Sequence, residues 1–166
     1  MKTLYLIRHA KSSWSIDGIE DRDRPLKGRG IRDAHLVSQY LREESINVDY
    51  FSMCSSPATR ALHTALIFAK NLSVPANKVA IDDELYHSSA EEILAVVRKT
   101  SDMCDAAMYF AHNPGITDFV NEMTSASVRN VPTTGVVIVR FDCQRWEDIG
   151  PGADLIQFEY PKRLKN

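Results

Sequence analysis

The stretch TLYLIRHA, residues 3–10, runs from an apolar segment directly into the charged pair Arg8 and His9. Its short apolar run predicts a β-strand over residues 3–8. Charged side chains at the end of a buried strand are costly to desolvate unless water or a ligand forms hydrogen bonds or ion pairs with them. The dipeptide alone therefore leaves two interpretations open. Either the strand ends at the surface, where Arg8 and His9 are solvated, or its carboxyl end forms a functional site.

Similar apolar runs predict further strands along the chain. They cover residues 50–54, 78–81, 106–111 and 136–141, and a weaker alternating run over residues 155–160 is expected to be an added edge strand.

Helical patterns lie between these runs. Two helices are predicted over residues 30–44 and 57–72. A third is expected to begin at the capping box Ser89-Ala90-Glu91-Glu92. A fourth is expected to begin after Asn113, with Asn113 as the N-cap and Pro114 as the first helical residue. Strands that alternate with helices favour an α/β layer structure on a mostly parallel sheet. At 166 residues, the chain is expected to be a single domain, residues 1–166.

Bulk composition narrows the function classes. A net charge of -2 gives no electrostatic footprint for nucleic acid or an anionic membrane. Three cysteines at wide spacing argue against a disulfide framework or a thiolate zinc site and suit a reducing compartment. The apolar run before Arg8 is too short for a signal peptide or a membrane span, so a cytoplasmic location is expected.

Several strand ends carry residues that suit anion chemistry. Arg60 follows the second predicted strand, and His112 follows the fourth. Ligands of parallel α/β sheets collect beyond the carboxyl ends of the strands, so these two residues are expected to converge with Arg8 and His9 on one rim. This convergence favours the functional interpretation of the opening stretch.

Two arginines and two histidines on one rim indicate a site for a phosphate group. Arginine makes bidentate hydrogen bonds to phosphate, and the helix N-termini after Ser55-Ser56-Pro57 and at Asn113-Pro114-Gly115 would add to the binding. A neutral imidazole is also a competent nucleophile toward phosphorus. We expect no metal or other cofactor, because the arginines provide the positive charge that a metal ion provides elsewhere.

The motifs Leu6-Ile7-Arg8-His9-Ala10-Lys11-Ser12, Ser55-Ser56-Pro57-Ala58-Thr59-Arg60-Ala61 and His112-Asn113-Pro114-Gly115 resemble the histidine phosphatase superfamily, also called phosphoglycerate-mutase-like. The small bacterial phosphohistidine phosphatase branch is the most similar, and the similarity includes Arg24-Pro25-Leu26 with Gly30. The resemblance implies a three-layer sandwich with helices on both faces of the sheet. Ala10 and Ala111 stand where the family often has glycine.

The resemblance also implies roles for individual residues. His9 is implied as the phosphate-accepting nucleophile, Arg8 and Arg60 as phosphate clamps, and His112 as a second imidazole of the pocket. Ser12 and Ser15, on the loop after the nucleophile, are candidate donors to phosphate oxygens.

The phosphohistidine branch lacks a well-defined general acid. Glu84 is the best candidate, with a solvated loop charge as the alternative. His35 and His87 are expected to be ordinary surface or partly buried residues.

Cys54 and Arg60 also satisfy the C-x5-R spacing of cysteine-dependent phosphatases. That chemistry needs successive backbone N–H groups around the phosphate and a depressed thiol pKa. The intervening residues contain no glycine, and Pro57 removes a donor, so Cys54 is expected to be a buried strand residue.

Three functional hypotheses follow. The chain between Arg60 and His112 is short, which leaves little for a lid and favours an open site that accepts phosphohistidine on a protein. A general small-molecule phosphomonoesterase and a non-catalytic phosphate-binding module are the alternatives. The sequence indicates no oligomeric state.

Overall fold

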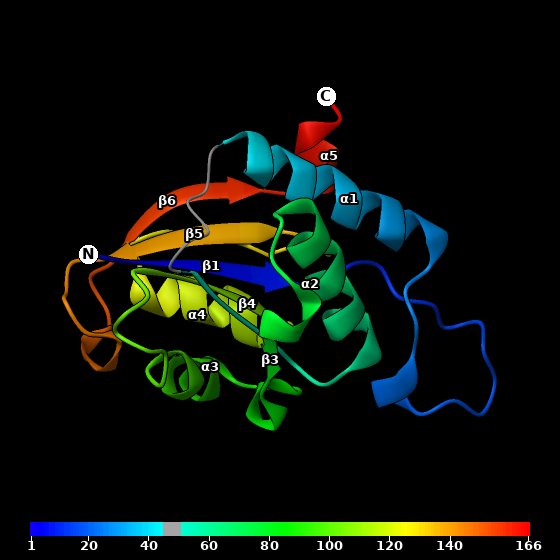
Figure 1. The fold of residues 1–166 in the computed structure, drawn as a ribbon, viewed down its shortest axis with the longest axis horizontal. Helices are drawn as coiled ribbons and strands as arrows, with labels where there is room; N and C mark the ends of the chain where they lie inside the picture. The colour runs from blue at the N-terminus through cyan, green and yellow to red at the C-terminus, as the bar shows by residue number, and fades with distance from the viewer. Residues whose placement is uncertain (45–50) are drawn as a thin grey trace.

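The computed structural model describes residues 1–44 and 51–166, in which the strands form one sheet of six in the order β3-β2-β4-β1-β5-β6 (Figure 1). The strands are β1 (Lys2–Arg8), β2 (Phe51–Ser55), β3 (Val79–Ile81), β4 (Ala106–Ala111), β5 (Val136–Phe141) and β6 (Asp154–Glu159). The first four run parallel to one another, whereas β5 pairs antiparallel with β1 and β6 antiparallel with β5. The carboxyl ends of β1, β2 and β4 therefore lie on the same edge of the sheet.

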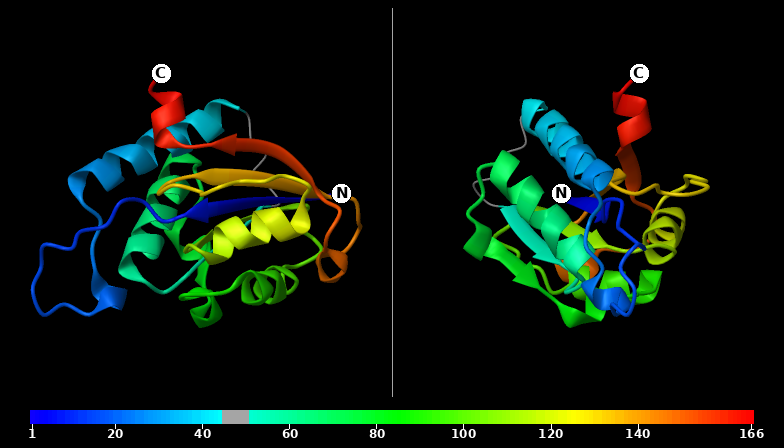
Figure 2. Two further views of the ribbon diagram at one scale, coloured as in Figure 1. Left: turned by 180° about the vertical axis from the view of Figure 1, so that it is seen from behind. Right: turned by 90° about the vertical axis from the view of Figure 1, so that its right-hand side faces the viewer.

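Helices cover both faces of this sheet (Figures 1 and 2). They are α1 (Gly28–Glu43), α2 (Thr59–Asn71), α3 (Ala90–Val97), α4 (Gly115–Met123) and the short α5 (Pro161–Leu164). α1 and α2 pack on one face with α5 against α1, and α3 and α4 cover the other. This three-layer arrangement confirms the expected α/β fold class.

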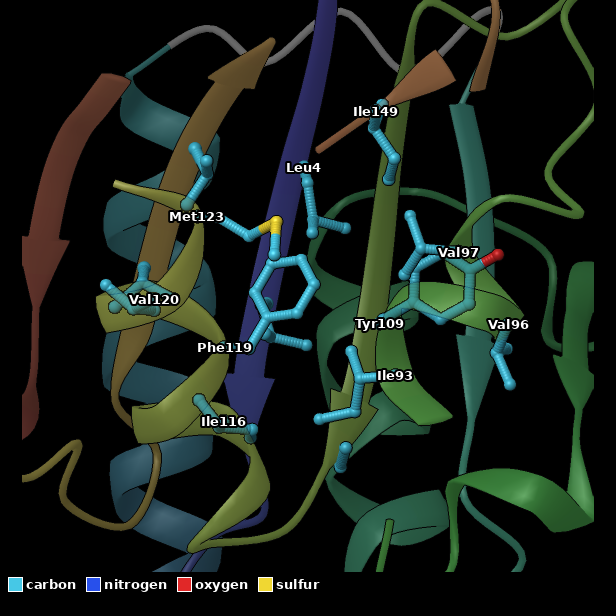
Figure 3. Close-up of a cluster of buried hydrophobic side chains, with 14 of the residues drawn as sticks. Leu4, Ile93, Val96, Val97, Tyr109, Ile116, Phe119, Val120, Met123 and Ile149 are labelled. Carbon is cyan, nitrogen blue, oxygen red and sulfur yellow. The ribbon is translucent and has the colours of Figure 1, made fainter. Parts of the chain in front are cut away.

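The face under α3 and α4 carries one of two apolar cores (Figure 3). On α4, Ile116, Phe119 and Val120 recur at helical spacing, so all three side chains face the sheet and are fully buried. They pack in one cluster with Leu4 of β1 and Ile93 of α3.

The opposite face carries the second core. Ile7 of β1 and Phe110 of β4 pack there with Phe68 of α2, whose ring meets that of Phe110 edge-on at a centroid distance of 5.2 Å. Since β1 and β4 are covered on both faces, their sequences are nearly continuous apolar runs rather than alternating ones.

The predicted elements are present, with ends shifted by one or two residues where they differ; Tyr50, in the predicted second strand, lies outside the described residues. The run over 155–160 is an edge strand, as expected. The Ser89 capping box is formed in both directions.

The prediction for the start of α4 was wrong by one residue. The helix begins at Gly115, after Pro114. The Asn113 side chain accepts hydrogen bonds from the N–H and the hydroxyl of Thr117, and its amide donates to Val131 O. Asn113 therefore joins α4 to a neighbouring loop rather than acting as a standard N-cap.

Among the described residues, no helix has the length and apolar character that a membrane crossing requires.

The burial of Phe119 predicts a large stability effect. Replacing Phe119 with Ala is expected to lower the free energy of unfolding by about 3–5 kcal/mol, because a cavity is left between α4 and the sheet. Urea denaturation measures the change. Leu66→Ala, at a partly exposed position on α2, is the control and should change stability by about 0.5 kcal/mol or less. Equal effects of the two substitutions would contradict the described packing.

Candidate active site

A cavity of about 250 Å³ opens at the carboxyl edge of the parallel strands. The structure brings together in it the four residues that the sequence singled out at three places in the chain. Its lining residues are Arg8, His9, Lys11, Ser12, Trp14, Asp21, Arg24, Arg60, His87, His112, Asn113 and Thr133.

His9 is held in one tautomer by the backbone of the next residue, Ala10. Its side chain is nearly buried, 8% exposed, and Nδ1 lies 2.8 Å from the carbonyl oxygen of Ala10. A carbonyl oxygen only accepts hydrogen bonds, so Nδ1 carries the hydrogen and Nε2 of the neutral ring keeps a free lone pair. Burial and the charges of Arg60 and Arg8 together lower the pKa of His9 to about 4, although the hydrogen bond to Ala10 O acts in the opposite direction. The imidazole is therefore neutral at working pH.

The loop that carries His9 is fixed by close contacts on two sides. The Ala10 amide donates to Thr64 Oγ1 at 3.0 Å, and that hydroxyl donates to Arg60 O at 2.7 Å. A Cβ at Gly30 would collide with the carbonyl oxygen of Lys11, so only glycine allows α1 to approach this closely. These contacts tie α1, α2 and the His9 loop together.

His112 lies beside His9, with ring centroids 5.2 Å apart. Its Nε2 shares a hydrogen bond of 2.8 Å with Ser56 Oγ at the start of the α2 segment. Its buried Nδ1 has no partner among the described residues. Burial, the neighbouring His9 and Arg60 lower the pKa of His112 to about 2, so this ring is also neutral.

Three arginines, together with Lys11, give the cavity its positive charge. Arg8 donates to Val131 O at 3.0 Å, and Arg24 donates to Ser12 Oγ at 2.8 Å. The buried Nε groups of Arg8 and Arg60 have no partner among the described residues. Buried N–H groups are normally paired, so unpartnered donors at this cavity suit a site that binds an oxyanion.

Asp21 is the acidic residue of the cavity. Its Oδ2 accepts hydrogen bonds from Tyr86 OH at 2.6 Å, Arg60 Nη2 at 3.0 Å and His87 Nε2 at 3.1 Å. Its Oδ1 accepts from Arg24 Nε at 3.1 Å. Partial burial acts to raise the pKa of Asp21, but the bonds from Tyr86, Arg24 and Arg60 outweigh it and hold the pKa well below its usual value. Asp21 is a carboxylate at working pH.

Two sequence candidates lie outside the cavity. Ser15 is exposed and bonds Ser13, with the two hydroxyl oxygens 2.7 Å apart, because its loop runs outward over the surface. Glu84 is exposed and faces Lys99 at 3.5 Å. The 3₁₀ turn Asp83–Leu85 buries Leu85 in the core, which turns Glu84 toward solvent. Ser12, in contrast, lines the cavity.

Sequence reasoning missed Asp21 and His87 as cavity residues. His87 was expected to be an ordinary surface or partly buried histidine, but it lines the cavity and bonds Asp21. Arg24 belonged to a motif quoted for the family resemblance, although no role was given to it. All three residues lie outside the α-helices and β-strands, so no periodicity marks them; the motif around Arg24 was the only signal.

Cys54 lies inside β2 and does not line the cavity. Burial raises the pKa of its thiol to about 11. A cysteine nucleophile requires a depressed pKa, so the C-x5-R interpretation is excluded.

Comparisons with known proteins agree on one family. Residues 4–96 match the model of the histidine phosphatase superfamily, branch 1. The uncharacterized protein Rv1276c of Mycobacterium tuberculosis (strain ATCC 25618 / H37Rv) is 30% identical over 167 residues, which cover 94% of this chain and all of the relative.

Two solved structures share the fold over almost the whole chain. The protein histidine phosphatase SixA complexed with tungstate superimposes with a TM-score of 0.80 at 18% identity and covers 98% of this chain and 99% of its own. A candidate phosphohistidine phosphatase SixA from Nakamurella multipartitia superimposes with a TM-score of 0.79 at 25% identity and covers 96% of each chain.

The lowered pKa values of the two buried histidines predict a pH-dependent stability. Between the ordinary pKa of about 6.5 and the folded values of about 4 for His9 and about 2 for His112, the unfolded chain binds protons that the folded protein does not. Stability is therefore lost as pH falls below about 6.5, by up to about 1.4 kcal/mol per pH unit for each histidine. Urea denaturation at pH 7 and pH 5 measures the loss.

The control for this prediction is a double variant, His9→Gln with His112→Gln. It keeps the other three histidines, so their contributions cancel in the comparison. The double variant should lose less stability than the wild type between the two pH values. Equal losses would contradict the neutral, buried state of the two rings.

Proposed function

The chain belongs to the histidine phosphatase superfamily, as its motifs predicted, and we propose that it is a metal-independent phosphatase that forms a covalent phosphohistidine on His9. Membership of the family agrees with the expected phosphatase class. One observation supports the mechanism most directly: the hydrogen bond from His9 Nδ1 to Ala10 O directs the lone pair to Nε2.

The reaction has two steps. Phosphate oxygens of the substrate accept hydrogen bonds from Arg8 and Arg60, and Nε2 of His9 attacks phosphorus as the bond to the leaving group breaks. Water then attacks the phosphohistidine, the nitrogen–phosphorus bond breaks, and orthophosphate leaves with His9 restored. The arginines stabilise the charge on the equatorial oxygens in both steps, so no metal ion is required.

For the substrate, we favour phosphohistidine on a protein. The cavity is small, opens at the surface, and has on its rim Trp14, which is 74% exposed and stacks on Arg24. An open, shallow site accepts a phosphorylated side chain of a partner. The name of the Nakamurella multipartitia relative agrees with this substrate class.

We further infer that residues 1–166 act as one domain, because β1 and β6, from opposite ends of the chain, belong to the same sheet. The cytoplasmic location stays a prediction.

The covalent intermediate can be trapped. Incubation with a ³²P-labelled substrate followed by a rapid alkaline quench is expected to leave a base-stable, acid-labile phosphate on His9, which peptide mass spectrometry locates. His9→Ala should lose the label and the activity, whereas Cys54→Ser should keep both. A label on another residue, or steady turnover by His9→Ala, would overturn the mechanism.

Substrate preference separates the proposed function from its alternatives. Turnover of a phosphohistidine-bearing protein, measured in excess EDTA, is expected to exceed that of phosphoserine and p-nitrophenyl phosphate in kcat/KM. Loss of activity in EDTA with recovery on adding a divalent cation would contradict the metal-independent mechanism. Faster turnover of the small esters would favour the general phosphomonoesterase, and phosphate binding without turnover would favour the non-catalytic module.

A further inference from the structure

We propose that His87 donates the proton to the leaving group and later accepts a proton from the attacking water. The inference rests on the proposed function and adds the proton carrier that Glu84, facing solvent, does not provide.

His87 is the third imidazole of the cavity. Its ring centroid lies 5.5 Å from that of His112, which in turn lies 5.2 Å from His9. Its side chain is 58% exposed, so it meets both the incoming substrate and solvent. A proton carrier needs both contacts, because it must reach the leaving group and exchange protons with water.

The ring of His87 is held by two neighbours. Nε2 lies 3.1 Å from Oδ2 of Asp21, and this carboxylate can only accept, so Nε2 carries a hydrogen. Tyr86 donates to the same oxygen, and its ring lies beside that of His87, with the centroids 4.1 Å apart and the ring planes tilted by 38°. An acid held by a carboxylate in this way has a fixed orientation and tautomer.

The backbone also fixes His87 in place. Leu85, two residues before it, and Ser88, directly after it, are buried. A Cβ at Gly115 would collide with the carbonyl oxygen of Ser88, so α4 packs directly against this loop. His87 itself has a φ of 51°, in the left-handed region that costs a residue with a side chain about 1 kcal/mol or more. Such conformations cluster at functional sites, where the surrounding contacts maintain them.

The other groups of the cavity are less suited to donate this proton. Asp21 is held as a carboxylate by its donors, and His112 is neutral because it is buried. Arginine does not give up its proton in proteins. Lys11 also lines the cavity, so it is tested directly below.

The proton balance is complete without another reactant. As the bond between phosphorus and the leaving oxygen breaks and the bond to His9 Nε2 forms, protonated His87 gives its Nδ1 proton to the leaving oxygen and becomes neutral, while its Nε2–H stays bonded to Asp21. When water attacks the phosphohistidine, neutral His87 takes a proton from that water. An alkoxide is a poorer leaving group than an imidazole, so His87 would extend the reactivity of the site to phosphomonoesters.

The leaving group of the substrate gives a direct test. The kcat/KM of the wild type, His87→Asn and His87→Gln is compared on phenyl phosphate, whose leaving group needs a proton, and on 2,4-dinitrophenyl phosphate, whose leaving group does not. Both His87 variants are expected to lose about 10²-fold or more on phenyl phosphate and less than about threefold on the dinitrophenyl ester. His63→Asn, a partly buried histidine on α2 away from the cavity, is the matched control and should change neither.

Each other outcome overturns the inference. Equal losses on the two esters in both His87 variants would indicate a structural role, and no loss would exclude His87 as the donor. A selective loss on phenyl phosphate in Lys11→Met, but not in the His87 variants, would assign the proton to Lys11. Labelling of His9 in His87→Asn by the dinitrophenyl ester is measured in parallel, so failure of the nucleophile and failure of the acid are told apart.

Discussion

The hydrogen bond between His9 Nδ1 and the carbonyl oxygen of Ala10 is the contact on which the candidate site depends. It assigns the lone pair of a neutral imidazole to Nε2. The geometry of this bond depends on the fixed backbone around Ala10. Thr64 Oγ1 accepts a hydrogen bond from the Ala10 N–H, and Gly30 of α1 packs against the carbonyl oxygen of Lys11. The chemistry of one ring nitrogen thus depends on the packing of two helices against the end of β1.

Burial and positive charge act on the site in the same direction. Both lower the pKa of His9, and both lower that of His112, so the cavity holds neutral imidazoles among arginines. Asp21 partly balances this charge. Its backbone carbonyl accepts a hydrogen bond from Arg60 Nη1, and its carboxylate accepts one from Arg60 Nη2. The buried Nε groups of Arg8 and Arg60 remain without a partner among the described residues, so the arginines keep donors that a bound phosphoryl group can use.

Much of the fold could be predicted because local and tertiary preferences agree. The central residues of β1 and all of β4 are nearly continuous apolar runs since helices cover both of their faces, and the Ser89 capping box forms as its sequence suggests. The start of α4 was misjudged because the Asn113 side chain serves contacts with Thr117 and with a distant loop. Such a contact is not visible in a local pattern.

The sequence by itself determined the α/β class, the family, and the four residues Arg8, His9, Arg60 and His112. Residues at the ends of parallel strands share one edge of the sheet, so their order along the chain is enough to bring them together. Only the tertiary structure decided that Asp21 and His87 enter the cavity while Glu84 and Ser15 face solvent. These four residues lie outside the α-helices and β-strands, where side-chain direction follows from packing against distant elements rather than from periodicity.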